Sequence, residues 1–304
     1  MKLTVALLTY NRPHYLRFAI ESILNQTFLD FEFLILDNGS TFETKEVINS
    51  FSDKRIKYIR NEINDRKFAN LPFDIAQGEY LIITHDDDVM EETFLQREIE
   101  ILDANPDVSL VGSCVSHINN DGTIIKKNAS RKWEDLIFKQ FGFIKSYCYN
   151  GNFLPCPTLM IRLSVVKENK FRYNLEVGPM ADLYLSFQFN LLTQSIYLIS
   201  DPLYRYRTHN NQDGFLNRIV MEKKIVPHIK GLLLSSGCIN LAKEYEQSAY
   251  SQTMAFYINR FVSNRMNYSD FKSNINELCL NGLKLNWLSV YWGLRGILQG
   301  ILKR

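Results

Sequence analysis

Residues Tyr80–Met90 read YLIITHDDDVM, an apolar run that ends in three consecutive aspartates. The apolar part, Tyr80–Thr84, predicts a buried β-strand. His85–Asp88 follow at the carboxyl end of that strand, and apolar residues then recur at helical spacing over Thr93–Leu102. Because strands that alternate with helices build βαβ units, this stretch predicts an α/β fold with a mostly parallel sheet and flanking helices.

The residues before Tyr80 repeat the same alternation. Polar clusters follow two of the expected strands, Thr9–Arg12 after the first and Asp37–Ser40 after the second. Since the carboxyl ends of parallel strands meet at one edge, where such sheets bind ligands, we expect both clusters and His85–Asp88 to converge on one rim. The expected strands are Leu3–Leu8, Phe31–Leu36 and Ile56–Ile59, and helices are expected after Pro13 and over Leu71–Ala76.

The chain changes character near residue 212. Strand signals continue up to that point, and helical periods dominate from there to the C-terminus. We therefore expect a first domain over residues 1–212 and a helical extension over residues 213–304. The remaining expected elements are strands at Val108–Ile118, Thr158–Leu163, Ile196–Ile199 and Leu203–Arg207, and helices at Trp133–Phe141 and Ala181–Leu192.

Composition excludes several classes of protein. The 304 residues are 46% hydrophobic and include 20 Phe and 16 Tyr, which supports a large core and excludes intrinsic disorder. The net charge of +2 gives no global basic field, so we expect no nucleic-acid partner. The 5 cysteines form no CxxC pair, which argues against a zinc site and a disulfide framework. Without a signal-peptide pattern or a bilayer-spanning apolar run, the sequence predicts a cytoplasmic protein.

A cation would relieve the crowding of the three aspartates at 86–88. Adjacent carboxylates repel one another and resist ionisation. Oxygen ligands suit Mg²⁺ or Mn²⁺, which commonly bridge protein carboxylates to a diphosphate. The alternative is a solvated acidic loop, or the first turn of the following helix, where the helix dipole favours carboxylates.

The Thr9–Arg12 cluster offers groups that bind a nucleotide. A base could stack on Tyr10, Arg12 could meet phosphate or ribose, and Asp37 could accept a hydrogen bond from a base N–H. The alternatives are a plain strand-to-helix loop and an ordinary turn after Asp37. Neither GxGxxG nor a GxxxxGK phosphate loop occurs, which argues against a dinucleotide oxidoreductase and a P-loop NTPase.

Together these motifs resemble the inverting family 2 glycosyltransferases of GT-A fold, over residues 3–209. TVALLTYNRP from Thr4 is similar to that family's first strand and loop, and LILDNGSTFET from Leu34 to its second-strand motif. NLPFDIAQGEY from Asn70 matches the segment before the metal motif, and YLIITHDDDVM resembles the strand that carries it. The resemblance implies a GT-A catalytic domain over residues 1–212.

The resemblance also implies roles for individual residues. Asp37 would bind the base, most often uracil in this family. Asp182 would be the general base, although the acidic residue that usually precedes it is Ala181 here. The alternatives are a carboxylate that only favours the helix N-terminus, and Glu176 as a weaker substitute for the base. Arg205 and Arg207 alternate with tyrosines, which puts both on one strand face, toward phosphate or solvent. The implied nucleotide-binding residues are Thr9, Tyr10, Asn11, Arg12, Asp37, Asn70, Asp86 and Asp87, and the implied metal ligands are Asp86, Asp87, Asp88 and His209.

The commoner form of the family's metal motif is LDxDD. Aligned with it, His85 stands at the first aspartate, and Asp87 takes the usual metal-contacting place. Asp86 and Asp88 remain alternative partners for Asp87.

The implied reaction is a metal-assisted single displacement with inversion. A sugar would pass from a nucleotide-diphospho-sugar, expected to be a UDP-sugar, to a hydroxyl of a glycan or a lipid-linked saccharide, in surface polysaccharide biosynthesis. One alternative is a sugar nucleotidyltransferase, which would normally show a Gly-rich basic phosphate loop near the first strand. The other is a non-catalytic protein that binds nucleotide sugars or glycans.

The C-terminal stretch over residues 286–304 reads NWLSVYWGLRGILQGILKR. Apolar residues recur there at helical spacing, beside Trp287, Trp292 and several basic residues. This pattern is compatible with a helix lying on an anionic membrane. The alternatives are a helix packed on the catalytic domain and a homodimer contact, and the Gly296–Gly300 spacing alone does not indicate packing.

Overall fold

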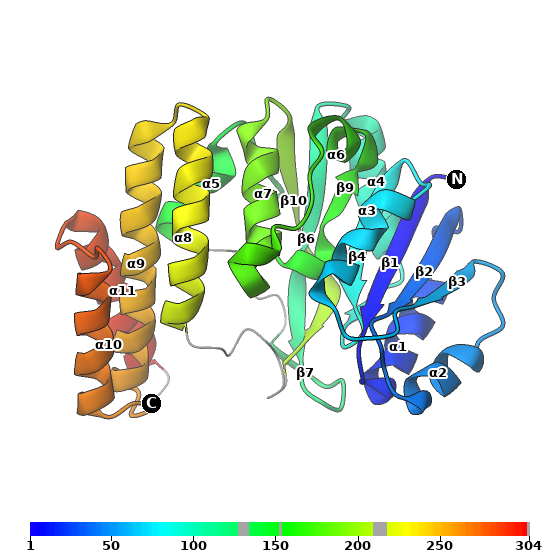
Figure 1. Cartoon of the computed structure of the whole chain (residues 1–304), viewed down its shortest axis with the longest axis horizontal. Helices are drawn as coiled ribbons and strands as arrows, with labels where there is room; N and C mark the ends of the chain where they lie inside the picture. Colours follow the sequence, from blue (N-terminus) through cyan, green and yellow to red (C-terminus); the bar gives the residue numbers. More distant parts are fainter. Residues whose placement is uncertain (127–133, 152–153, 209–217, 303–304) are drawn as a thin grey trace. The chain divides into compact units, whose positions relative to one another are not determined.

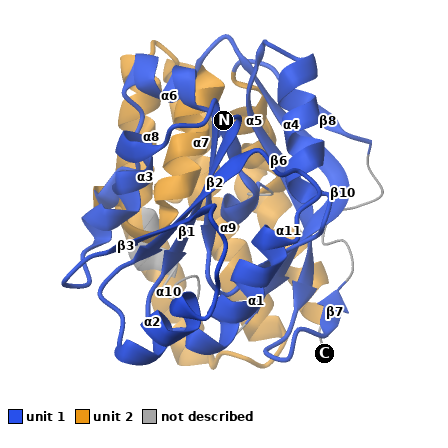
Figure 2. Ribbon diagram, turned by 90° about the vertical axis from the view of Figure 1, so that its right-hand side faces the viewer, with its two compact units in different colours: residues 1–140, 153–175, 192–212 blue, residues 141–152, 176–191, 213–304 orange. Residues whose placement is uncertain are grey.

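The computed structural model describes residues 1–126, 134–151, 154–208 and 218–302, with no account of the side chains of 218–222. The described chain forms two compact units (Figures 1 and 2). The sheet unit comprises residues 1–140, 153–175 and 192–212. The helical unit comprises residues 141–152, 176–191 and 213–304.

The sheet unit is built on one sheet of ten strands in the order β3-β2-β1-β4-β9-β6-β10-β5, with β7 on β6 and β8 on β10. The long strands all run in one direction, because β1, β2, β3 and β4 pair in parallel and β6 pairs in parallel with β10. The short strand β9 runs against its neighbours β4 and β6. The expected α/β fold with a mostly parallel sheet is therefore confirmed. The strands are β1 (Leu3–Thr9), β2 (Phe31–Asp37), β3 (Ile56–Arg60), β4 (Tyr80–His85), β5 (Val89–Met90), β6 (Val108–Ile118), β7 (Ile124–Lys126), β8 (Leu136–Phe138), β9 (Met160–Arg162) and β10 (Ser195–Arg207).

Helices of the sheet unit follow the strands as the alternation predicts. The helix α1 (Pro13–Leu24) begins at a proline, whose missing N–H needs no partner in a first turn. Its apolar stripe, which includes Leu16, Ile20 and Ile23, packs into the core. The other helices are α2 (Phe42–Asn49), α3 (Leu71–Ile75), α4 (Phe94–Ala104) and α6 (Leu163–Asn169).

Two expected elements differ in the structure. The helix expected at Trp133–Phe141 is wrong, because Leu136–Phe138 form strand β8, which pairs with β10. The two strands expected at Ile196–Ile199 and Leu203–Arg207 are one strand, β10. Its register on β6 shifts on either side of Pro202, and this irregularity interrupts the alternation that the sequence shows.

The helical unit carries the helical region that the sequence predicts after residue 213. Its core includes Tyr147, Phe187 and Tyr245, with ring centroids 5.4 Å apart between Phe187 and each tyrosine. None of the helices in the described residues combines the length and apolarity needed to cross a membrane. The division at residue 212 stays a prediction; α5 and α7 group with the helical unit. The helices are α5 (Gly142–Asn150), α7 (Ala181–Leu191), α8 (Arg218–Ser235), α9 (Ile239–Val262), α10 (Tyr268–Leu280) and α11 (Trp287–Ile301).

Candidate active site

The carboxyl ends of β1, β2 and β4 lie side by side in the sheet. Thr9 pairs with Asp37 across β1 and β2, and Leu8 pairs with His85 across β1 and β4. The main-chain N–H of Asn38 donates to the carbonyl of Thr9 at 3.0 Å. The three polar clusters therefore meet at one rim, and the predicted convergence is confirmed.

Asp86 is buried at the centre of this rim, and both of its carboxylate oxygens accept hydrogen bonds. The Thr9 hydroxyl donates to Oδ2 at 2.7 Å, and the Tyr10 N–H donates to the same oxygen at 3.1 Å. Arg12 donates to Oδ1 at 3.0 Å. Burial raises the pKa of Asp86, and the charge of Arg12 opposes that shift. Asp86 thus ties the loop after β1 to the turn after β4.

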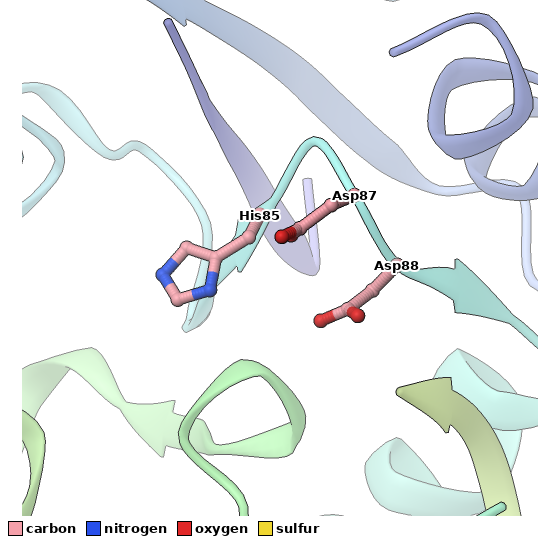
Figure 3. Close-up of side chains that lie close together, drawn as sticks. All are labelled: His85, Asp87 and Asp88. Atoms are coloured by element: carbon pink, nitrogen blue, oxygen red, sulfur yellow. The ribbon is translucent and has the colours of Figure 1, made fainter. Parts of the chain in front are cut away.

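His85, Asp87 and Asp88 form a second group on the same turn, here called the acidic turn. One potential ligand atom from each residue lies within 4.8 Å of the others. Figure 3 shows the three side chains projecting toward the same side from the end of β4 and the turn that follows it. Arg12 approaches Asp87 as well, with Nη1 3.3 Å from Oδ2.

Asp88 carries a buried oxygen without a partner. Its Oδ1 accepts from the main-chain N–H of Arg207 at 2.8 Å. Its Oδ2 has no hydrogen-bond partner among the described residues. Burial and the neighbouring Asp87 carboxylate raise the pKa of Asp88 well above its ordinary value. A divalent cation fits this arrangement, because it would supply the positive charge that the orphaned oxygen and the crowded carboxylates lack.

Hydrogen bonds from Arg207 hold the acidic turn in place. The Arg207 side chain is only 2% exposed, so the expectation of a solvated arginine is wrong. Its guanidinium donates to the carbonyl of Asp87 at 2.7 Å and to those of Asn119 and Asn120 at 2.7 and 2.8 Å. The sequence shows that Arg207 alternates with tyrosines along a strand, but not that it contacts three carbonyls from two separate segments.

Asp37 organises the turn after β2. Its Oδ1 accepts from the Ser40 N–H at 2.8 Å, and its Oδ2 accepts from the Tyr58 hydroxyl at 2.7 Å. The side chain is wholly buried, with Nε of Arg60 3.8 Å from Oδ2. Burial and the Asp37 carboxylate raise the pKa of Tyr58, so its hydroxyl keeps the proton that it donates. The sequence gives no sign of the Tyr58 contact, because nothing in β3 marks this residue.

Asn11 joins the loops after β1 and β2. Its backbone takes a left-handed conformation, with φ at 53°, which asparagine tolerates better than most residues. Its N–H donates to Ser40 Oγ at 3.0 Å, and its Oδ1 accepts from the Thr41 N–H at 2.7 Å. Tyr10, next to it, keeps an exposed ring. Tyr10 therefore offers an open aromatic ring, while Asn11, which is also exposed, braces the rim.

The remaining predicted site residues are Asn70, Asp182 and His209. The amide of Asn70 is engaged on both sides by the main chain of Tyr173, at 3.0 and 2.9 Å. Asp182 lies in the first turn of α7, in the helical unit, where the helix dipole favours a carboxylate. His209 lies outside the described residues.

Known proteins with a similar fold include two glycosyltransferases of known structure. The S. aureus TarS 1–349 structure in complex with UDP-GlcNAc superposes with a TM-score of 0.69 at 16% identity, covering 100% of this chain and 90% of the TarS 1–349 chain. The mannosyltransferase PcManGT of Pyrobaculum calidifontis, in complex with GDP-Man and Mn²⁺, gives a TM-score of 0.56 at 14% identity, covering 99% of this chain and 86% of PcManGT. These likenesses confirm the GT-A fold.

Comparison of the sequence is more specific than comparison of the fold, because it identifies the family. Glycosyltransferase MJ1057 of Methanocaldococcus jannaschii is 32% identical over 226 residues, which are 72% of this chain and 75% of that protein. Glycosyltransferase GlyG of Streptococcus pneumoniae is 24% identical over 271 residues, 81% of this chain and 88% of that protein. The model of the family described as glycosyl transferase family 2 matches residues 4–169, and this chain is a glycosyltransferase that belongs to that family.

Proposed function

We propose that this glycosyltransferase moves a sugar from a nucleotide-diphospho-sugar to an acceptor hydroxyl, with inversion at the anomeric carbon. The observation that carries the proposal is the acidic turn at the rim, where the carboxyl ends of β1, β2 and β4 meet. Such a rim is the usual ligand site of a parallel sheet. The proposal extends the family assignment to a substrate class and a stereochemical course.

Asp87, Asp88 and His85 are the proposed metal ligands, with Mn²⁺ or Mg²⁺ as the cation. The unpartnered Asp88 Oδ2 supports this choice, and the three hydrogen bonds that Asp86 accepts favour a bracing role for that residue. When bound there, the cation would supply positive charge against the donor's diphosphate. His209 stays a proposed additional ligand.

The rim residues would hold the donor. The exposed ring of Tyr10 is placed to stack on a base, and Arg12, already beside Asp86 and Asp87, carries a guanidinium suited to phosphate. Asp37 is the proposed acceptor for a base N–H; each of its oxygens already accepts one hydrogen bond and has a second lone pair. Asn70 is the remaining residue that we propose to contact the nucleotide-sugar donor.

Asp182 is the proposed general base. Its carboxylate would take the proton from the acceptor hydroxyl while that oxygen forms a bond to the anomeric carbon. The bond from the anomeric carbon to the diphosphate oxygen breaks at the same time, and the nucleoside diphosphate leaves with the electron pair. An α-linked donor would thus give a β-linked product.

The donor is expected to be a UDP-sugar, and the TarS complex with UDP-GlcNAc supports that expectation. The GDP-Man complex of PcManGT makes a GDP-sugar the second candidate. We propose a glycan or a lipid-linked saccharide as acceptor, surface polysaccharide biosynthesis as the setting and the cytoplasm as the location. The free cysteines of the described chain are compatible with a reducing compartment.

A donor panel tests the proposal. Purified protein is incubated with UDP-, GDP- and dTDP-sugars, with Mn²⁺ or with EDTA, and released nucleoside diphosphate is measured beside the melting temperature. We expect Mn²⁺-dependent release from one donor, lost in Asp87→Ala and kept in Asp107→Ala, which changes an exposed aspartate. If no donor releases nucleoside diphosphate and none stabilises the protein, the proposed donor class is overturned.

A further inference from the structure

The C-terminal helix α11 packs with its small residues inward. Gly296 and Gly300 face α9 so closely that a Cβ on Gly296 would lie 2.6 Å from the carbonyl oxygen of Ala255. A Cβ on Gly300 would lie 2.8 Å from Cβ of Val262. Trp292 is a large side chain on this inner side, and its indole N–H donates to the carbonyl of Cys148 at 3.1 Å. The helix is therefore fixed in the helical unit through its glycine-rich side.

Most of the other large apolar residues of α11 are exposed. Leu294 is 58% exposed and Leu298 is 62% exposed, although leucine usually lies inside a soluble protein. Leu285, just before the helix, is 92% exposed. A contiguous apolar surface of this kind marks an interaction site. We call it the outer face, and it consists of Trp287, Val290, Tyr291, Leu294, Ile297, Leu298 and Ile301.

Along the sequence, the charged residues of the segment that carries the outer face are all of one sign. From Leu278 to Arg304 the sequence contains no Asp or Glu, and its charged residues are Lys284, Arg295, Lys303 and Arg304. A basic apolar surface complements anionic lipid. A second copy of the chain would instead bring two basic segments together. The charge therefore favours a membrane surface over a dimer partner.

The length of α11 and its aromatic residues also fit a membrane surface. At about 1.5 Å per residue, the 15 residues of α11 are too short to cross a hydrocarbon core of roughly 30 Å. Trp287 and Tyr291, both exposed, have the amphipathic rings that favour the headgroup level of a bilayer. We propose that α11 lies in the plane of an anionic membrane with its outer face in the headgroup region.

Vesicle co-sedimentation tests this surface. The full chain is mixed with vesicles of phosphatidylcholine and phosphatidylglycerol, or of phosphatidylcholine alone, without any sugar nucleotide. We expect binding to the anionic vesicles that weakens in high salt, and at least about tenfold weaker binding for Leu294→Gln/Leu298→Gln. The matched control is Leu29→Gln/Ile137→Gln, which changes two exposed apolar residues of the sheet unit and should bind like wild type.

Tryptophan fluorescence gives a second readout on the folded protein. The chain has 3 Trp, and Trp287 is the one on the outer face, so anionic vesicles should shift the emission to shorter wavelength in wild type and much less in Trp287→Phe. No pelleting of wild type, or equal pelleting of the Leu294/Leu298 variant, overturns the proposal. A dimer in sedimentation velocity that this variant abolishes would also overturn it, because a second copy would then cover the face. Since no donor is present, failure here leaves the proposed glycosyl transfer untouched.

Discussion

The guanidinium of Arg207 donates to the main-chain carbonyl of Asp87 at 2.7 Å, so the last residue of β10 holds the turn that follows β4. The main-chain N–H of Arg207 also donates to Asp88, at 2.8 Å. A side chain and a main-chain group of one residue thus fix two neighbouring aspartates. Arg207 is therefore a positioning residue for the acidic turn, acting through Asp87 and Asp88.

Replacing Arg207 should loosen this turn. Arg207→Met removes the buried guanidinium that donates to the carbonyls of Asp87, Asn119 and Asn120, and we expect the free energy of unfolding to fall by about 3 kcal/mol. The Mn²⁺ concentration for half-maximal activity should rise more than kcat falls. Arg205→Ala is the matched control, because its partially exposed pair with Glu91 should contribute no more than about 1 kcal/mol. Equal metal requirements in both variants would contradict the positioning role.

The turn after β2 allows a test of donor recognition. Asp37→Asn removes the carboxylate charge but keeps one acceptor oxygen, so a base N–H loses a charge-assisted bond. We expect KM for the donor to rise about tenfold with a smaller change in kcat. Tyr58→Phe is the control, since it removes the hydroxyl that donates to Asp37 and leaves the carboxylate charged. The direct base contact is wrong if Asp37→Asn binds the donor like wild type.

Glu98 in α4 makes stability depend on pH. Both of its carboxyl oxygens are buried without a partner in the described chain, and burial raises its pKa well above the ordinary value. A glutamate in the unfolded chain loses its proton at about pH 4.3, whereas Glu98 in the folded protein keeps its proton to higher pH. Between the pKa of Glu98 in the unfolded state and its raised pKa in the folded state, the folded state binds more protons. The free energy of unfolding therefore falls as pH rises from the first pKa to the second.

Two variants of Glu98 separate charge from polarity. Glu98→Gln should abolish this part of the pH dependence, measured by urea unfolding between acid and neutral pH. Glu98→Met should also remove the buried polar group and raise the free energy of unfolding at neutral pH by about 1–2 kcal/mol. An unchanged slope in Glu98→Gln would mean that other groups cause the pH dependence.

Alanine substitutions at two glycines of α11 should have opposite effects on stability. Gly296→Ala would place a Cβ against the Ala255 carbonyl, and we expect a loss of about 2 kcal/mol or more. A Cβ on Gly293 would meet the end of the Met254 side chain at 3.4 Å, which is an ordinary contact. Gly293→Ala should therefore be neutral or stabilising by up to about 1 kcal/mol, because alanine favours helix. Thermal unfolding of both variants checks the sign.

Local sequence signals predict the strands that build the rim but not the contacts between them. The apolar runs before Asp37 and Asp86 identify β2 and β4, and the polar residues after them mark the strand ends. Three adjacent aspartates look alike in sequence, and only the fold brings Thr9 and Arg12 onto Asp86. These contacts span more than seventy residues, so no local pattern encodes them.

The corrected elements have a similar cause. The strand β8 is three residues long and exists through its pairing with β10, so it carries no periodicity of its own. Around Pro202 the register shift of β10 interrupts the alternation within a continuous strand. The packing side of α11 is also decided by close approach to α9, which a glycine spacing by itself does not reveal.

Mn²⁺ binding, followed by electron paramagnetic resonance in the presence of UDP, tests the central claim most directly. The account predicts that Asp87→Asn and Asp88→Asn each weaken Mn²⁺ binding by at least about tenfold. Asp86→Asn should lower the melting temperature, because Asp86 braces the rim, yet keep Mn²⁺ affinity within about threefold of wild type. Loss of Mn²⁺ in Asp86→Asn together with wild-type binding in Asp88→Asn would contradict the assignment of the acidic turn as the metal site.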